Sequence, residues 1–113
     1  MNNWEIKFYK TDSGRVPVSD YIEEQEIKRR VAIYNAINLV EEFGIEESHL
    51  AARKIKGKPY KGLYEWKIDS SRIIYFLLSG KTCVLVHAFT KQKNKTPQFE
   101  LVTARKRMLD YLR

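Results

Sequence analysis

The sequence predicts an α+β fold: a small antiparallel β-sheet with helices near the N-terminus and one helix at the C-terminus. Three β-type runs follow one another at about 63–68, 72–79 and 82–90, and the breaks between them are short and polar. Parallel pairing needs crossovers of about a dozen residues or more, so these runs form an antiparallel meander. Apolar residues at helical spacing lie outside the meander, at about 26–43 and 97–112, and helices segregated from a sheet define the α+β class.

The length of the chain limits the number of domains. With 113 residues, of which 43% are apolar, the chain builds one small core and is too short for two. No internal repeat, linker or low-complexity segment interrupts it. We therefore expect a single domain that spans residues 1–113.

The first two elements are a strand and a short helix. Residues 4–9 alternate mostly apolar with charged side chains, as a half-exposed strand does, and residues 12–14 end the run. A short helix is expected after Pro17, where Ser19 or Asp20 can serve as its N-cap.

The longest helix is expected from about Glu26 to Phe43, with Gly44 ending it as a left-handed cap. After it we expect a helical turn at 48–53 and a basic loop at 53–61, whose glycine and proline exclude a continuous helix. Helical spacing defines a buried face formed by Ile33, Ala36, Ile37, Val40 and Phe43, which Ile27, Val31 and Tyr34 extend.

Alternation along the meander assigns its side chains to two faces. Tyr64, Trp66 and Ile68 share one face, while Glu65 and Lys67 share the other. Lys67 therefore projects from the sheet beside a carboxylate.

The last element is a helix whose first residue is Pro97. Thr96 is expected as its N-cap. One apolar face continues to the C-terminus through Leu101, Ala104, Met108 and either Tyr111 or Leu112.

Basic residues are concentrated in the second half of the chain. Residues 1–52 hold 6 Lys and Arg against 10 Asp and Glu, whereas residues 53–113 hold 15 against 4, so the balances are −4 and +11. Such an excess favours polyanionic partners, nucleic acid above all. A merely soluble basic face is the alternative interpretation of the same charges.

Composition argues against several other classes of protein. Cys83 is the only cysteine, so no intrachain disulfide forms, and its apolar run indicates a buried, inert thiol in a reducing cytoplasm. No run approaches about 18 consecutive apolar residues, and the N-terminus lacks the apolar region of a signal peptide. We therefore expect a cytoplasmic protein without a membrane partner.

A metal or cofactor is not expected either. His49 and His87 with one cysteine cannot assemble a zinc site of ordinary ligand spacing. Residues 53–113 carry only four carboxylates, which is too few for a two-metal nuclease, and no glycine-rich phosphate loop is present.

The basic second half suits metal-independent cleavage of RNA. Activating the 2′-hydroxyl against the adjacent phosphate needs a base, a cationic clamp for the transition state and a proton donor for the leaving 5′-oxygen. Lys67, Lys91 and Lys93 are candidates for the base or the acid. Arg72 suits a bidentate phosphate clamp. Arg72 and Lys91 are neighbours in the sheet only if the strands pair antiparallel. Both stand at strand ends, so we expect that truncating either side chain removes little buried apolar area.

His87 has two interpretations. It lies in mid-strand on the parity of Leu85 and Phe89, which fits a packed strand histidine, and it also fits a proton donor at the site. RNA contact is assigned to a further set of residues. Two of them have an alternative interpretation: Lys95 also fits a solvated loop charge, and the ring of Tyr64 also fits the core. The set comprises Lys56, Lys58, Lys61, Tyr64 and Lys95.

Four segments carry a resemblance to a known family. They contain Gly62-Leu63-Tyr64-Glu65, Arg72 with Tyr75, residues 85–91, and Thr96-Pro97 with Glu100, Ala104 and Arg107. In these segments, and over about residues 4–110, the chain resembles the RelE/HigB superfamily of bacterial toxin–antitoxin toxins, in particular its phage-derived HigB-like branch. The resemblance implies a RelE-like fold.

The resemblance also implies an activity and partners. Such toxins cleave mRNA on translating ribosomes and are neutralised by a cognate antitoxin, often a helix-turn-helix protein. By position, Lys67 corresponds to a catalytic strand lysine, Arg72 to the phosphate-binding arginine and Lys91 to the basic residue that ends the third strand. The chain departs from the best-known RelE toxins at Glu65, where those are basic, and no tyrosine follows the lysine-rich loop.

The expected function is therefore that of a type II toxin: a ribosome-dependent mRNA endoribonuclease that inhibits translation. Its expected partners are mRNA, the ribosome and an antitoxin. Two alternatives stay open, a ParE-like toxin that inhibits DNA gyrase on the same fold, and a non-catalytic, phage-derived protein that binds RNA or a partner. Retention of Lys67, Arg72 and Lys91 argues against the first alternative, because gyrase inhibition needs no phosphate-cleaving cluster.

Overall fold

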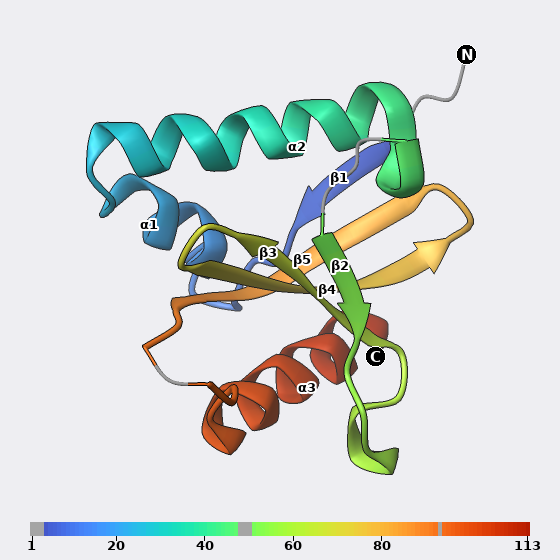
Figure 1. Cartoon of the computed structure of the whole chain (residues 1–113). Coiled ribbons are helices and arrows are strands. Elements are labelled where there is room, and N and C mark those ends of the chain that lie inside the picture. The colour runs from blue at the N-terminus through green and yellow to red at the C-terminus, as the bar shows by residue number, and fades with distance from the viewer. Residues whose placement is uncertain (1–3, 48–50, 93) are drawn as a thin grey trace.

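A five-stranded β-sheet organises the computed structural model, which describes residues 4–47, 51–92 and 94–113 (Figure 1). Along the sheet the strands follow the order β1-β5-β4-β3-β2. β1 runs parallel to β5, and the other neighbouring pairs are antiparallel. The strands are β1 (Glu5–Phe8), β2 (Ala51–Lys54), β3 (Leu63–Ile68), β4 (Ser71–Ser79) and β5 (Thr82–Thr90).

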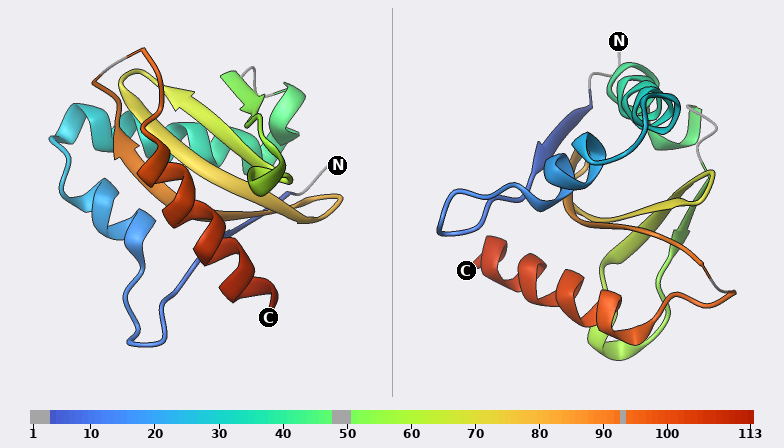
Figure 2. Two further views of the ribbon diagram at one scale, coloured as in Figure 1. Left: turned by 90° about the horizontal axis from the view of Figure 1, so that it is seen from below. Right: turned by 90° about the vertical axis from the view of Figure 1, so that its left-hand side faces the viewer.

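Helices cover both faces of this sheet. α1 (Pro17–Glu23) and α2 (Ile27–Glu47) lie on one face and α3 (Gln98–Leu112) on the other, as the right-hand view of Figure 2 shows. A short 3₁₀ helix, η1 (Lys58–Tyr60), lies between β2 and β3. None of the helices within the described residues is long and apolar enough to cross a membrane. The expected α+β class, with a RelE-like arrangement, is confirmed, but the sheet is mixed and not wholly antiparallel as expected, because β1 pairs in parallel with β5.

The sheet separates two apolar clusters. Trp66 is fully buried in the cluster beneath α1 and α2, and its ring centroid lies 4.6 Å from that of Tyr75. The cluster on the opposite face includes Ala104 and Met108 of α3. Cys83 is fully buried in the first cluster, where desolvation raises the pKa of its thiol to about 12. Burial therefore keeps this thiol protonated and unreactive.

The antiparallel meander is confirmed with nearly the expected limits. Lys67 pairs with Arg72 between β3 and β4, and Arg72 pairs with Phe89 between β4 and β5. Trp66 packs beneath α1 and α2, whereas Glu65 and Lys67 line a cavity on the other face. Strand alternation therefore assigned these side chains to the correct faces.

The two helix caps expected from the sequence do not form. α1 begins at Pro17, so Ser19 and Asp20 lie inside the helix, and its N-cap residue Val16 makes no side-chain hydrogen bond. The first helical residue has the fixed φ of proline, which starts the helix without a capping side chain.

Thr96 does not cap α3. Pro97 is the N-cap residue, and the helix begins one residue later than expected, at Gln98. The Thr96 hydroxyl instead donates a hydrogen bond to the Glu65 carboxylate at 2.8 Å, which ties the start of α3 to the sheet.

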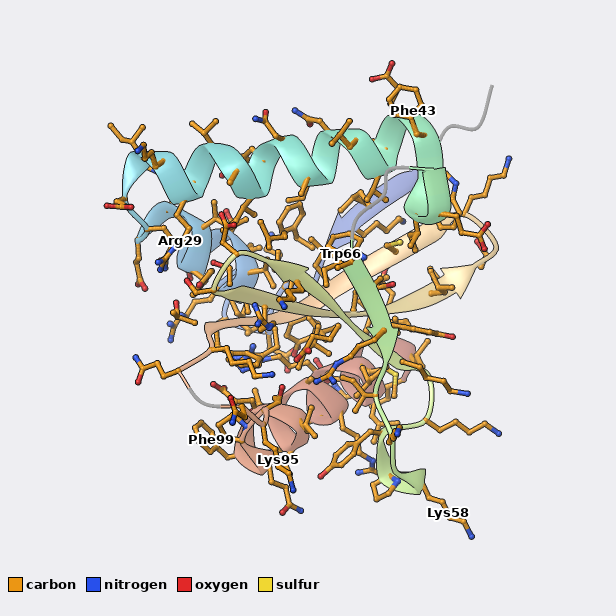
Figure 3. The ribbon with its side chains drawn as sticks, in the orientation of Figure 1. Arg29, Phe43, Lys58, Trp66, Lys95 and Phe99 are labelled. Atoms are coloured by element: carbon orange, nitrogen blue, oxygen red, sulfur yellow. The ribbon has the colours of Figure 1, made fainter. Side chains whose placement is uncertain are left out.

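α2 continues past its expected end, but its helical backbone is interrupted at Gly44 (φ 86°, ψ 171°). The positive φ agrees with the sequence prediction, whereas ψ is extended and a further helical turn follows. A Cβ at this position would lie 2.5 Å from Trp4 Nε1, so only glycine fits without a shift. Phe43 is 44% exposed and points away from the sheet, so its expected place on the buried face is wrong (Figure 3).

The buried face of α2 is narrower than the sequence predicts. The side chains that pack on the sheet are Ile33, Ala36, Ile37 and Val40. Ile27, Val31 and Tyr34 are exposed instead. They are three or four residues apart and form another side of the helix. Because their spacing is as helical as that of the buried residues, the spacing alone does not distinguish them from the core.

β2 replaces the helical turn expected at 48–53, of which residues 48–50 lie outside the described residues. Its pairing with β3 places Ala51 opposite Lys67 and Lys54 opposite Tyr64. The sequence of β2 has no strand preference of its own, so the neighbouring strand decides its conformation. The segment expected as a basic loop at 53–61 contains the end of β2 and all of η1.

Candidate functional site

Three cations meet where β3 ends, β4 begins and β5 ends. Lys67 and Arg72 stand directly opposite each other on β3 and β4. The backbone N–H of Lys91 donates to the Ser70 carbonyl at 2.8 Å, which holds the segment after β5 against the β3–β4 turn. Lys67, Arg72 and Lys91 line one cavity of about 290 Å³. The antiparallel register thus brings these three predicted site residues together.

Arg72 is the most constrained of the three cations. Its side chain is 8% exposed, and its Nη1 donates to the carbonyl oxygens of Asp69 at 2.7 Å and Ser71 at 3.0 Å. Asp69 has a positive φ of 53°, so the β3–β4 turn aims its carbonyl at the guanidinium. The expectation that truncating Arg72 removes little buried area is wrong, because the turn and the strands enclose it.

A buried carboxylate lies beside the three cations. Glu65 is 3% exposed; its Oε1 accepts from Arg53 Nε at 3.1 Å and its Oε2 accepts from Thr96 at 2.8 Å. Glu65 therefore ties edge strand β2 and the segment before α3 to the centre of the sheet. Neither Arg53 nor Glu65 was predicted as a site residue, although strand alternation correctly placed Glu65 beside Lys67.

The cavity is the middle part of a longer cationic groove. It shares Lys67, Arg72 and Lys91 with a neighbouring cavity of about 510 Å³, and shares Arg53 and Glu65 with another of about 630 Å³. We call these three adjoining cavities the cationic groove. Its cationic lining consists of Arg53, Lys54, Lys56, Lys67, Arg72, Lys91 and Lys95. Only Glu65 and Asp69 among its described lining residues are acidic.

The predicted RNA-binding residues are divided between the groove and other surfaces. Lys56 and Lys95 line the groove beside Thr96. Lys58 and Lys61 are exposed in or next to η1 and line none of its three cavities, and Lys58 points away from the protein in Figure 3. Lys93, predicted as a base or acid, lies outside the described residues.

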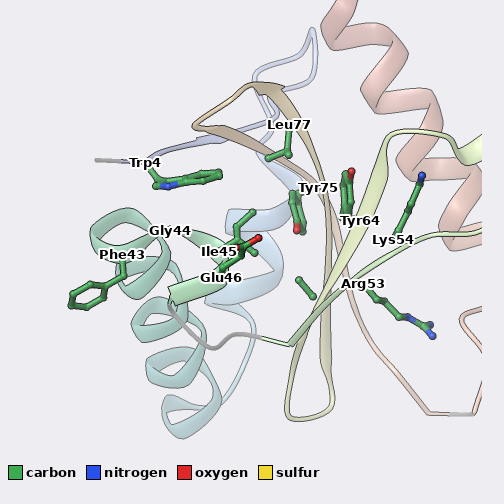
Figure 4. Close-up of a pocket in the computed structure, with 11 residues that line it drawn as sticks. Trp4, Phe43, Gly44, Ile45, Glu46, Arg53, Lys54, Tyr64, Tyr75 and Leu77 are labelled. Atoms are coloured by element: carbon green, nitrogen blue, oxygen red, sulfur yellow. The ribbon is translucent and has the colours of Figure 1, made fainter. Parts of the chain in front are cut away.

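Tyr64 lies on the opposite face of the sheet from the groove. Its ring stacks on Tyr75, with centroids 5.4 Å apart, and both rings line a cavity of about 410 Å³ with Trp4 and Leu77 (Figure 4). Most of its lining residues are apolar, although Glu46 also lines it, and we call it the apolar cavity. The Arg53 and Lys54 residues of β2 line this apolar cavity as well as the groove. Strand β2 thus forms a wall shared by two chemically different cavities.

His87 is held by α3 and does not line the cationic groove. Its Nε2 lies 2.6 Å from Glu100 Oε1, and Arg107 Nη1 donates to its Nδ1 at 3.0 Å. A guanidinium only donates, so Nδ1 accepts and the proton of the neutral ring is on Nε2, where it is donated to Glu100. Burial lowers the pKa of His87; Glu100 opposes this shift and Arg107 adds to it.

The parity assigned to His87 from the sequence is correct for Phe89, whose ring stacks on it with centroids 5.7 Å apart, and wrong for Leu85. The β4–β5 register shifts between Ile74 and Tyr75, as a β-bulge produces. Leu85 consequently packs beneath α1 and α2, whereas His87 contacts α3, although alternation places the two on the same face.

Among the described residues, no three His, Cys, Asp or Glu side chains are grouped as a metal site requires.

Comparison with known proteins shows the family of the chain. Residues 20–109 match the family described as "Phage derived protein Gp49-like (DUF891)". The chain belongs to this Gp49-like family. The matched range contains α2, every strand except β1, and all described residues of the cationic groove. None of the curated protein sequences compared with the chain matches it significantly.

The fold of this Gp49-like chain is similar to two solved structures. One is a chain of the archaeal RelE–RelB complex from Pyrococcus horikoshii OT3, with 13% identity and a TM-score of 0.58, covering 82% of this chain and 99% of that one. The other is a chain of the RelB–RelE antitoxin–toxin complex from Methanococcus jannaschii, with 17% identity and a TM-score of 0.54, covering 96% and 99%. At these identities the likeness shows the fold alone.

Proposed function

We propose that this Gp49-like chain is the toxin of a type II toxin–antitoxin system and cleaves mRNA on the ribosome without a metal. The observation that carries the proposal is the arrangement of Lys67, Arg72 and Lys91 in one cavity of the cationic groove. Two carbonyl bonds hold the Arg72 guanidinium in place before any substrate binds. Such preorganised cations stabilise the charge that develops on a phosphate during cleavage.

In this mechanism Arg72 binds the scissile phosphate. A guanidinium has five N–H donors, and the two bonds to backbone carbonyls come from Nη1. Its Nε and Nη2 groups make no hydrogen bond to the described residues. They supply the parallel donors with which an arginine binds two phosphate oxygens.

The lysines of the same cavity carry out the proton transfers. One amine, in its neutral form, takes the proton of the 2′-hydroxyl, and the resulting O2′ attacks the adjacent phosphorus. The bond from phosphorus to the 5′-oxygen breaks, and the other lysine, as its ammonium, gives a proton to that oxygen. The products are a 2′,3′-cyclic phosphate and a free 5′-hydroxyl. We assign these two roles to Lys67 and Lys91, because His87 lies outside the groove.

The ribosome and an antitoxin complete the proposal. The groove is open along one surface of the protein, so the ribosome is proposed to hold the mRNA in line for attack. The similar solved structures contain a RelB antitoxin, and an antitoxin is proposed for this chain by analogy. The proposed site of action is the cytoplasm, where mRNA is translated.

Induced expression followed by mapping of mRNA 5′-ends tests this function. We expect new 5′-ends inside coding regions, in a fixed position relative to the reading frame. The Lys67→Ala variant serves as the inactive control, because Lys67 is exposed and its truncation leaves the core intact. Growth arrest without new mRNA ends would contradict the ribonuclease and favour gyrase inhibition, which DNA topology assays detect.

A further inference from the structure

Strand β2 is an edge strand whose outer side pairs with no strand of the described residues. Its hydrogen bonds to β3 can be assigned from one contact. The N–H of Ile55 donates to the Leu63 carbonyl at 3.0 Å, and these residues continue the β2–β3 register directly. Hydrogen-bonded pairs alternate in an antiparallel ladder, so Arg53 and Ala51 also bond inward. Ala52 and Lys54 therefore direct their N–H and C=O groups outward.

Each side of this edge leads to a different cavity. Ala52 pairs with Trp66, on the face of the apolar cavity, and lies at the boundary where it lines both that cavity and the groove. Trp4, Ile45 and Leu77 line the same apolar cavity (Figure 4). Arg53 is opposite Glu65 on the other face, where the cationic groove begins. Successive side chains of a strand point to opposite faces. A strand added to β2 would therefore place alternate side chains beside the apolar cavity and beside the groove.

We propose that the outer edge of β2 binds an extended segment of a partner protein in which apolar and acidic side chains alternate. The backbone of the segment pairs with Ala52 and Lys54. Its apolar side chains pack at the cavity lined by Trp4 and Leu77, and its acidic side chains meet Arg53 and the cations of the groove. Main-chain hydrogen bonds supply affinity in this mode of recognition, and the alternate side chains supply specificity.

Charge complementarity selects this occupant over a second copy of the chain. Pairing β2 with another β2 would bring two copies of Arg53 and Lys54 together, and like charges across a strand pair are destabilising. Cations on an edge strand are also a common means of preventing self-association. The same cations favour an acidic segment.

The proposal extends the proposed function, because such a segment would occupy the groove in place of RNA. Its test does not depend on RNA cleavage. The probe is a soluble peptide of about eight residues in which glutamate alternates with valine and leucine. The control peptide has the same composition with its glutamates grouped at one end. Binding is measured by calorimetry with the full chain, and backbone amide exchange is followed by NMR.

We expect the alternating peptide to bind at least about tenfold more tightly than the grouped peptide, a difference of about 1.4 kcal/mol. It should slow exchange of the Ala52 and Lys54 amides, which point outward. The amides of Arg53 and Ile55, already bonded to β3, should change little. Equal affinity of the two peptides, or binding that leaves the Ala52 and Lys54 amides unprotected, would overturn the proposal.

Two pairs of variants separate the contributions of backbone and side chain. Ala52→Pro removes an outward N–H that the ladder with β3 does not use, and it should weaken binding at least about tenfold. Leu77→Ser should weaken binding similarly, whereas Leu78→Ser, at a neighbouring exposed residue that does not line the apolar cavity, should change it less than about twofold. Unchanged binding by Leu77→Ser, or dimers of the unliganded chain formed through β2, would also refute it.

Discussion

Arg72 shows how a charged residue becomes buried at a strand end. The sequence places it correctly beside Lys67 and Lys91, since these positions follow from antiparallel pairing. Its burial could not be predicted in the same way. The two carbonyls that bind Nη1 belong to Asp69 and Ser71, and their orientation depends on the positive φ of Asp69 in the turn.

Replacing Arg72 should therefore affect both activity and stability. Arg72→Ala removes a transition-state donor, and such losses lower the cleavage rate by about 10²–10³-fold. It also leaves two carbonyl acceptors without their partner, at a cost of roughly 1–3 kcal/mol in the free energy of unfolding. Cleavage rates and chemical denaturation measure the two effects. Lys91→Ala, which keeps its backbone bond to Ser70, should lower only the rate.

A second residue-scale expectation concerns His87 and pH. Folding lowers the pKa of His87 from its ordinary value of 6.5, chiefly through burial, so the unfolded chain binds this proton more readily. Its contribution to stability is therefore complete above the ordinary pKa. It decreases as the pH falls from 6.5 through the lowered pKa of the folded protein.

Denaturation by urea at a series of pH values from about 7.5 to 5 measures this contribution. His87→Gln should unfold more easily at neutral pH and lose stability less steeply on acidification. Identical slopes for the parent and His87→Gln would contradict the assignment of a neutral, buried His87.

At the scale of the elements, local pattern predicts the meander and the helices but not the edges of the sheet. β3, β4 and β5 alternate clearly and are joined by short turns, so sequence alone defines them. β2 is a strand because β3 lies beside it. β1 pairs in parallel with β5, and the paired residues Glu5 and Thr82 are 77 positions apart in the sequence. Such long-range pairing leaves no local signal.

The cationic groove was predictable only in part for the same reason. Lys67, Arg72 and Lys91 follow from strand ends, whereas Arg53 joins the groove only because β2 forms. The bulge in the β4–β5 pair moves His87 to the face of α3, and a one-residue insertion in a ladder has no signature in the alternation of side chains.

The interruption of α2 gives an element-scale test. Gly44 has a positive φ of 86°, and a Cβ there would lie 2.5 Å from Trp4 Nε1. Gly44→Ala should therefore lower the free energy of unfolding by about 1–3 kcal/mol, measured by chemical denaturation. Gly80→Ala is the matched control, because no atom lies within 4 Å of its added Cβ and its φ is not in the positive range. Equal stability of the two variants would show that the close approach of Trp4 is relieved easily.

At the scale of the whole molecule, the acidic and basic halves of the sequence supply different elements of the fold. Residues 1–52 carry the balance of −4 and include both helices on one face, whereas residues 53–113 carry +11 and supply every cation of the groove. Much of the basic excess seen in the sequence therefore lines the cationic groove. An open cationic surface attracts RNA but does not by itself orient a 2′-hydroxyl for in-line attack.

The most direct test of the proposed activity compares single-turnover cleavage of one mRNA, free and bound to programmed ribosomes, by the purified protein. Orientation of reacting groups is worth up to about 7–11 kcal/mol, so cleavage on ribosomes should be at least about a hundredfold faster than cleavage of free mRNA. Lys67→Ala should abolish the ribosomal reaction. Equal rates on free and ribosome-bound mRNA, or no cleavage of either by folded protein, would contradict the account.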